Sequence, residues 1–231
     1  MKMRLLLLCT FLLCSCANKT MVISPDYKKN AIKKAGIVVV LMEQPDINNT
    51  DDVTDDFGEG DPDELYLKHF NQKFTEYLQK YTYLSPITID TLNAQMTFIE
   101  ETLELNQKKD IIIKVPQSSE KYVFNGFEPE YILFIQKFSI IRKAATSGVF
   151  IPGPPGRPGG YTGGTSPALL HVGEMLVWDN YNQKKVLYGQ FDAKATFLFA
   201  MTKNVWDAAL KDMILTIFKD SPFMLKSTVR R

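Results

Sequence analysis

The sequence predicts an α+β fold in which helices pack on a mixed sheet, with the element order β-α-β-α-β-β-β-α. The first observation is a continuous apolar run at residues 36–42, GIVVVLM, which is typical of a buried strand. The second is a pair of amphipathic helical patterns, at residues 62–81 and 203–219. The third is a series of long strand patterns, at residues 130–143, 168–178 and 184–199.

The opening strand and helix carry clear local signals. Gly36 to Met42 lacks polar alternation, which predicts a strand covered on both faces. The helix begins at Asp61, whose carboxylate can cap free amides, and Pro62 occupies the first turn, where no hydrogen bond is lost. Its apolar positions recur every three or four residues, at Leu67, Phe70, Phe74, Leu78 and Tyr81.

The middle of the chain predicts a second strand and a second helix. Tyr83 to Ile89 is the strand, and the helix begins near Asp90. Its apolar face would hold Leu92, Met96, Ile99 and Leu103. Residues 110–127 leave two alternatives open, a short hairpin or an irregular excursion, because Pro116 and Gly126 interrupt a strand-like pattern.

The last third of the chain predicts a hairpin and a closing helix. Residues 179–183, DNYNQ, form a turn-rich connection between two long strands, which indicates an antiparallel pair. The closing helix spans residues 203–219, and Ser221 and Pro222 end it.

The N-terminus resembles the export signal of bacterial lipoproteins. Lys2 and Arg4 precede an apolar run at residues 5–13 that is too short to span a bilayer, which needs about 20 residues as a helix. The segment ends at residues 13–16, LCSC, which resembles a lipobox. We therefore expect residues 1–15 to be removed and Cys16 to carry diacylglycerol and an N-acyl chain; an ordinary secretory signal is the alternative.

The remaining chain is expected to be one domain on a tether. Residues 16–34 are polar and weakly periodic, which suits a flexible tether, residues 35–222 form a single periplasmic domain, and residues 223–231 are a C-terminal tail. All three cysteines lie within the first sixteen residues, so the folded part can form no disulfide and no thiolate metal site.

The charge balance argues against a nucleic-acid partner. Removal of the signal takes away Lys2 and Arg4, which leaves 25 basic and 26 acidic side chains and a net charge of about −1. Ala17 follows Cys16, where an aspartate would resemble an inner-membrane retention signal, so we expect the protein to be anchored in the outer membrane and to face the periplasm.

Three features of the domain resemble a known group of proteins. They are the short apolar opening strand, the late hairpin that turns at residues 178–180, WDN, and returns through residues 186–189, VLYG, and the amphipathic last helix. With the lipobox, this arrangement is similar to the periplasmic lipoproteins built like the curli-secretion channel subunit and the activators of penicillin-binding proteins. The resemblance covers most of residues 36–219 and implies a compact sheet-and-helix domain in the envelope, without any matched functional residue.

An acidic loop at residues 46–64 is the candidate ion site. Its carboxylates could bind calcium weakly, because calcium prefers flexible, oxygen-rich loops. The candidate ligands are Asp51, Asp52, Asp55, Asp56, Glu59 and Asp61. Their spacing does not match a calcium-loop register, and a solvated, mobile loop is the favoured interpretation.

A Pro/Gly-rich segment at residues 147–167, SGVFIPGPPGRPGGYTGGTSP, separates two strand patterns. Its composition predicts a long extended loop, because proline and glycine are unsuited to a helix or a central strand. Loops of this length in compact domains are uncommon unless they are functional or disordered. The side chains expected to contact a partner are Phe150, Ile151, Arg157 and Tyr161.

The search for a catalytic site is negative. His69 is interpreted as a helix-surface residue, and His171 cannot pair with Glu174 because side chains three apart on a strand point to opposite faces. The sequence therefore favours a non-enzymatic lipoprotein that binds or assembles another envelope protein. The alternative is a self-associating ring or secretion-channel subunit of the outer membrane, and an envelope hydrolase ranks third.

Overall fold

The computed structural model describes residues 21–28, 34–91, 96–106, 109–117, 121–151, 160–198 and 200–225. Its strands are β1 (Met21–Ile23), β2 (Ala35–Leu41), β3 (Asp46–Ile47), β4 (Leu84–Thr91), β5 (Phe98–Asn106), β6 (Lys109–Pro116), β7 (Tyr131–Ile151), β8 (Gly160–Asp179) and β9 (Lys184–Thr196). Its helices are η1 (Pro25–Tyr27), α1 (Thr50–Phe57), α2 (Pro62–Tyr81) and α3 (Lys203–Phe218).

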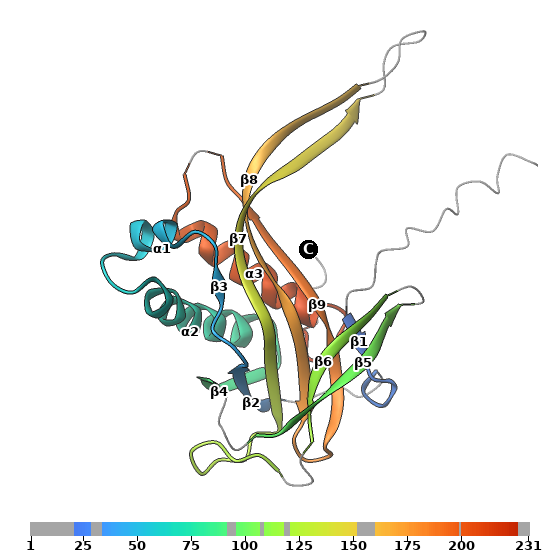
Figure 1. The fold of residues 1–231 in the computed structure, drawn as a ribbon. Coiled ribbons are helices and arrows are strands. Elements are labelled where there is room, and N and C mark those ends of the chain that lie inside the picture. The colour runs from blue at the N-terminus through green and yellow to red at the C-terminus, as the bar shows by residue number, and fades with distance from the viewer. Residues whose placement is uncertain are drawn as a thin grey trace, which may run out of the picture.

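The main sheet is mixed, as the predicted α+β class requires. Its strand order is β1-β9-β8-β7-β2-β4, and β3 adds to β7. Strand β2 runs parallel to both of its neighbours, whereas β7, β8 and β9 form an antiparallel meander. Figure 1 shows α2 and α3 on one side of this sheet and the β5–β6 hairpin on the other.

Strand β2 is covered on both faces, which confirms the prediction from its continuous apolar run. Ile37 and Val39 belong to the core beneath the helices, and Val38 and Val40 belong to the core beneath the β5–β6 hairpin. All four side chains have no exposed surface. The sheet is therefore the middle layer of three.

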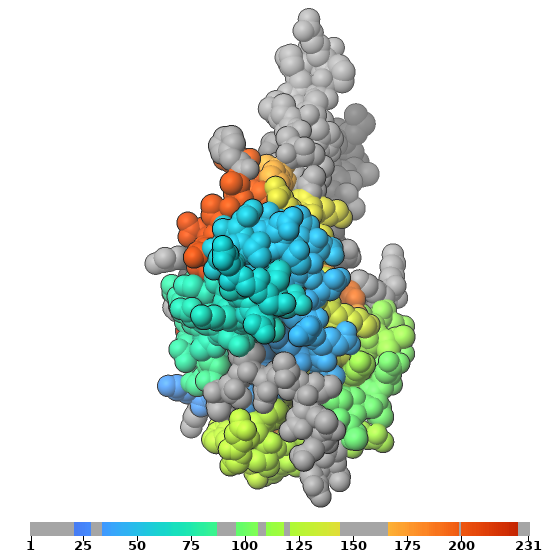
Figure 2. Space-filling view, turned by 60° about the vertical axis from the view of Figure 1, so that its left-hand side comes forward, coloured from blue at the N-terminus to red at the C-terminus, as the bar shows by residue number. Residues whose placement is uncertain are grey.

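Helix α2 begins as predicted. The Asp61 carboxylate accepts hydrogen bonds from the backbone N–H groups of Asp63 and Glu64, which satisfies amides that the helix leaves unpaired. Phe70 and Phe74 of its apolar side are fully buried and stack with ring centroids 4.8 Å apart. Figure 2 shows α1 and α2 spread over this face of the molecule.

The predicted second helix is wrong, because residues 98–106 form strand β5, which pairs antiparallel with β6. Exposed Thr102 and Glu104 alternate with the more buried Leu103 and Leu105, and this period of two is that of a strand. Neither alternative for residues 110–127 describes their first part, which is a single strand, β6, whose hairpin partner β5 precedes the range.

Gln136 of β7 fastens this hairpin to the main sheet. Its buried side-chain amide accepts a hydrogen bond from the backbone N–H of Lys114 at 2.9 Å and donates one to the backbone C=O of Lys114 at 2.8 Å. The side-chain amide thus pairs with Lys114 of β6 as a peptide group of a neighbouring strand would. The next residue, Lys137, has a φ of 48° where the β7–β8 register shifts, so the chain bulges beside this contact.

The expected tether and tail are both wrong in part, because each end contributes to the fold. Residues 21–23 form β1 on the edge of β9, and the Tyr27 hydroxyl donates to the Asp179 carboxylate at 2.7 Å. At the other end Phe223 is fully buried and Leu225 donates its N–H to the C=O of Tyr81. The domain therefore includes residues 21–28 and extends to at least residue 225; residues 17–20 lie outside the described residues.

Candidate functional site: a projecting ribbon and a helix-lined pocket

The expected loop at residues 147–167 is largely wrong, because most of it is paired strand. Strands β7 and β8 continue past the end of β9 as a two-stranded ribbon, formed by residues 144–151 and 160–167. The last pairing between β8 and β9 is Ala168 with Thr196, and beyond it β8 pairs only with β7. Figure 1 shows this ribbon projecting from the end of the sheet.

Proline and glycine are compatible with the ribbon because, among the described residues, its two strands form a ladder only with each other. One further backbone hydrogen bond reaches the base of the ribbon, from the Phe197 N–H to the C=O of Pro167 at 3.0 Å. Pro167 lies opposite Ala144, at the first position where β9 no longer accompanies β8. A central strand would lose a ladder hydrogen bond at that position, whereas a strand with a free edge does not. The composition argument excluded a central strand correctly, but the extended loop that it predicted is mostly a paired strand with a free edge.

The expected partner residues are distributed over the ribbon. Phe150 lies opposite Tyr161, and Ile151 lies opposite Gly160, in the backbone register. Arg157 lies outside the described residues. The sixteen ribbon positions contain no charged residue, and three of the four expected contact residues belong to them.

A pocket of about 400 Å³ lies where α2 and α3 meet the end of α1. Its described lining is Phe57, Leu65, Lys68, His69, Gln72, Lys73, Lys203 and Asp207. Three ammonium groups and one carboxylate give this lining an excess of positive charge, which favours anionic over cationic molecules. None of these eight residues is a serine, threonine or cysteine, so the lining supplies no hydroxyl or thiol nucleophile.

His69 lines this pocket with a side chain that is only 10% exposed, which corrects its interpretation as an ordinary helix-surface residue. Its Nε2 lies 3.1 Å from Oδ1 of Asp207, and its ring contacts the Phe57 ring in a tilted arrangement with centroids 4.5 Å apart. Burial lowers the pKa of His69, and the Asp207 carboxylate opposes that effect. Lys73 also reaches Asp207, with Nζ to Oδ2 at 3.6 Å.

His171 lies deeper, on the helix-covered face of the sheet. It is fully buried, its Nε2 lies 3.5 Å from the Tyr66 hydroxyl, and burial lowers its pKa to about 3. Glu174 faces the other way and forms an ion pair with Lys137 at 3.0 Å, as the strand argument predicts. His171 is therefore a neutral core residue, held among aromatic rings that include Phe138.

The expected acidic loop is wrong for much of its length, because it contains β3 and helix α1. Three of its carboxylates hold the fold together: Asp61 caps α2, Asp52 accepts from Arg142 at 2.9 Å, and Asp56 accepts from Trp206 Nε1 at 2.7 Å. Within the part of the chain that the structure describes, no three carboxylate, imidazole or thiol groups gather as a metal site would require.

The lipidation residue, Cys16, lies outside the described residues. Within the described ranges, no helix is long and apolar enough to cross a membrane.

Sequence reasoning missed the pairing of His69 with Asp207 because the two residues come from helices 138 positions apart. The local signal was weak: the helical neighbours of His69 on α2 include Lys73 but no carboxylate one turn away. Only the packing of α3 against α2 supplies Asp207.

Comparison with known proteins gives only distant likenesses to solved structures. No family model and no curated protein matches the chain. The chain is similar to a crystal structure described as a neuraminyllactose-binding hemagglutinin homolog from Helicobacter pylori, with a TM-score of 0.34 and 7% sequence identity over 82% of each chain. At that level of similarity the likeness carries no inference about this protein.

Proposed function

We propose that this chain is a lipid-anchored lipoprotein of the outer membrane that faces the periplasm and acts as a non-enzymatic binding or assembly factor for another envelope protein. The anchor would be Cys16, carrying diacylglycerol and an N-acyl chain. The proposal includes no cofactor beyond this lipid. The observation that carries the binding role is the ribbon.

The ribbon supports this proposal because it presents unpaired backbone groups on two edges. In an antiparallel pair, about half of the residues of each strand direct their N–H and C=O groups away from the partner strand. Natural proteins protect such edges with charges or with covering segments, whereas residues 144–151 and 160–167 carry no charge. An extended segment of a partner can add to such an edge by backbone hydrogen bonds.

A photo-crosslinking amino acid at position 150 tests this role in living cells. We expect one defined envelope protein to be linked at position 150, and no link to that protein from the matched control at Tyr181, which is 47% exposed at the far end of the sheet. A variant in which Asn-Gly replaces residues 145–166 should keep its melting temperature and lose the product. Equal products from positions 150 and 181 would contradict the role of the ribbon.

Self-association is the second candidate, because a free edge of one copy can pair with the free edge of another. The same crosslinking experiment separates the two. A ladder of multiples of this chain would indicate a ring or channel subunit, whereas a single foreign product would indicate a binding or assembly factor.

A further inference from the structure

The position of β1 fixes where the chain leaves the domain toward Cys16. In β1, Met21 lies opposite Gly189 and Ile23 lies opposite Leu187. Ser24 and Tyr27 hold the following residues in place: the Ser24 hydroxyl donates to the C=O of Lys185 at 2.6 Å, and the Tyr27 hydroxyl donates to the Asp179 carboxylate at 2.7 Å. The N-terminal segment is thus part of the domain from Met21 onward.

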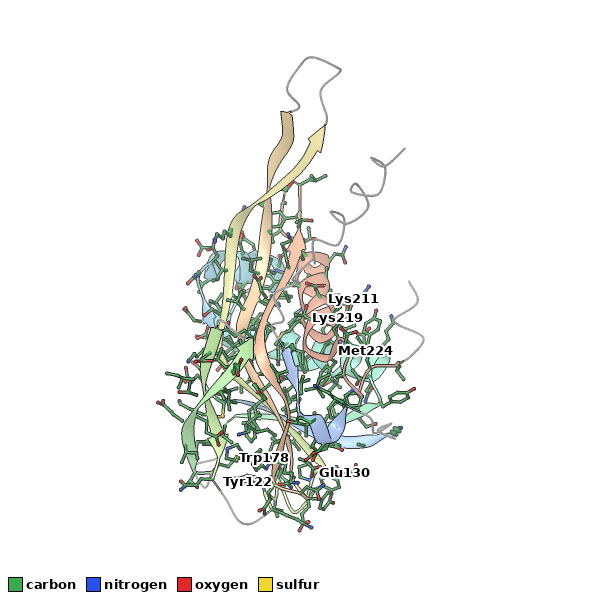
Figure 3. The ribbon with its side chains drawn as sticks, turned by 90° about the vertical axis from the view of Figure 1, so that its right-hand side faces the viewer. Tyr122, Glu130, Trp178, Lys211, Lys219 and Met224 are labelled. Atoms are coloured by element: carbon green, nitrogen blue, oxygen red, sulfur yellow. The ribbon has the colours of Figure 1, made fainter. Side chains whose placement is uncertain are left out.

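The antiparallel register also gives a direction. From Ile23 back to Met21, the chain passes β9 residues of increasing number, and so advances toward Thr196. Thr196 pairs with Ala168 at the end of the sheet where the ribbon begins. Met21 is therefore the end of β1 that lies nearer to the ribbon. Figure 3 shows the ribbon at one end of the molecule and Tyr122 and Trp178 at the other.

Only four residues, 17–20, separate Cys16 from Met21, so their Cα atoms can lie at most about 18 Å apart. Along β9, the seven residue steps from Gly189 to Thr196 advance about 23 Å, and the eight paired positions of the ribbon add about 26 Å. If the strands stood upright on the membrane, the ribbon would pass the level of Cys16 by about 30 Å, which is the thickness of the hydrocarbon core.

A two-stranded ribbon with free edges cannot cross hydrocarbon by itself, because its unpaired N–H and C=O groups would find no partner there. With the ribbon end toward the membrane, the sheet therefore has to incline, which brings the ribbon alongside the membrane surface. In the headgroup layer, water and lipid oxygens can satisfy the edge groups, and apolar and aromatic residues are favoured.

The distribution of charge agrees with this placement. The ribbon is uncharged, whereas charged side chains begin at its base, where Lys143, Lys194 and Asp192 are exposed. The two lysines can extend toward lipid phosphates. Leu198, just beyond β9 at the same end, is 75% exposed. The opposite end carries the exposed ion pairs Lys121–Glu128 and Lys184–Asp26.

We propose that the ribbon lies in the headgroup layer of the membrane that anchors Cys16, with the turn at residues 179–183 directed away from that membrane. This inference rests on the lipid anchoring in the proposed function. It adds that the envelope partner is met at the surface of the same membrane.

Fluorescent labelling at single cysteines tests the placement, because the folded domain has no cysteine of its own. Phe150→Cys and the control Tyr181→Cys would each be labelled with an environment-sensitive nitrobenzoxadiazole group on the acylated protein. The labelled proteins would be reconstituted in phosphatidylethanolamine–phosphatidylglycerol vesicles, with or without lipids that carry a nitroxide near the headgroup. We expect quenching of severalfold at position 150 and none at position 181.

Lengthening the tether supplies a second arm. Ten Gly/Ser residues inserted between Ala17 and Asn18 should reduce the quenching at position 150, because a longer tether no longer forces the sheet to incline. Quenching that is absent at position 150, or greater at position 181, would overturn the placement. Equal quenching with the long tether would overturn the argument from reach.

The anchoring itself is checked separately by metabolic labelling with a fatty acid, with Cys16→Ser as the control. The native protein should carry the label and Cys16→Ser should not. A native protein without the label would overturn both proposals. An acylated protein with an unquenched position 150 and an intact crosslink to a foreign protein would overturn only the membrane placement.

Discussion

Buried His171 should make the domain lose stability as the pH falls. Its pKa is lowered from 6.5 to about 3 because burial disfavours the charged imidazole. In the unfolded chain the same residue takes up a proton below about pH 6.5, so acid favours unfolding. The penalty grows by about 1.4 kcal/mol for each pH unit between these two pKa values, reaches about 2 kcal/mol at pH 5, and stops growing below about pH 3.

Urea unfolding between about pH 7.5 and pH 5 measures this effect, and the variant His171→Gln isolates it. Glutamine removes the titration and keeps a polar group beside the Tyr66 hydroxyl, 3.5 Å from the imidazole in the native chain. We expect the free energy of unfolding of the native chain to fall by about 2 kcal/mol more than that of the variant.

His69→Gln is the matched control. The pKa of His69 is also lowered, so its effect has the same sign, but the Asp207 carboxylate partly offsets the burial that causes it. The substitution His69→Gln should therefore reduce the pH dependence of the free energy of unfolding by less than His171→Gln does. Parallel pH profiles for the native chain and His171→Gln would refute the reasoning.

Two further substitutions test how the layers are fastened. Gln136→Ala leaves the backbone N–H and C=O of Lys114 without their buried partner and should cost about 1–3 kcal/mol in urea unfolding, while Gln136→Glu should restore at most one of the two bonds. Tyr27→Phe removes the hydrogen bond to Asp179, and should cost about 1 kcal/mol and increase proteolysis near β1; unchanged proteolysis would show that strand pairing alone holds the segment.

Local sequence signals were sufficient wherever the residues of an element specify it without a distant partner. The apolar run of β2 and the Asp61 cap of α2 were both read correctly, because one needs only burial and the other only a carboxylate near free amides. Helix α1 was missed because it buries only Val53 and is otherwise mostly acidic and polar. Its position depends on Trp206, whose Nε1 donates to Asp56.

The remaining errors come from pairing between distant segments. Strand β1 has three residues and exists through its register with β9, 164 or more positions away. The hairpin of β5 and β6 was misread because Met96, Ile99 and Leu103 also fit a helical spacing. The ribbon was misread because composition excludes proline from central strands without saying where a sheet ends.

The layers that cover the two faces of the sheet differ in how closely each is joined to the rest of the fold. Helices α2 and α3 share a single hydrophobic core with most of the strands, whereas β5 and β6 form a separate two-stranded sheet over a smaller core. An isolated hairpin is marginally stable, so this cover depends on Gln136 and on the apolar residues beneath it. Local opening of this hairpin would uncover Phe134 and Leu176 to any molecule that recognises apolar surface, without breaking the core that α2 and α3 share with the sheet.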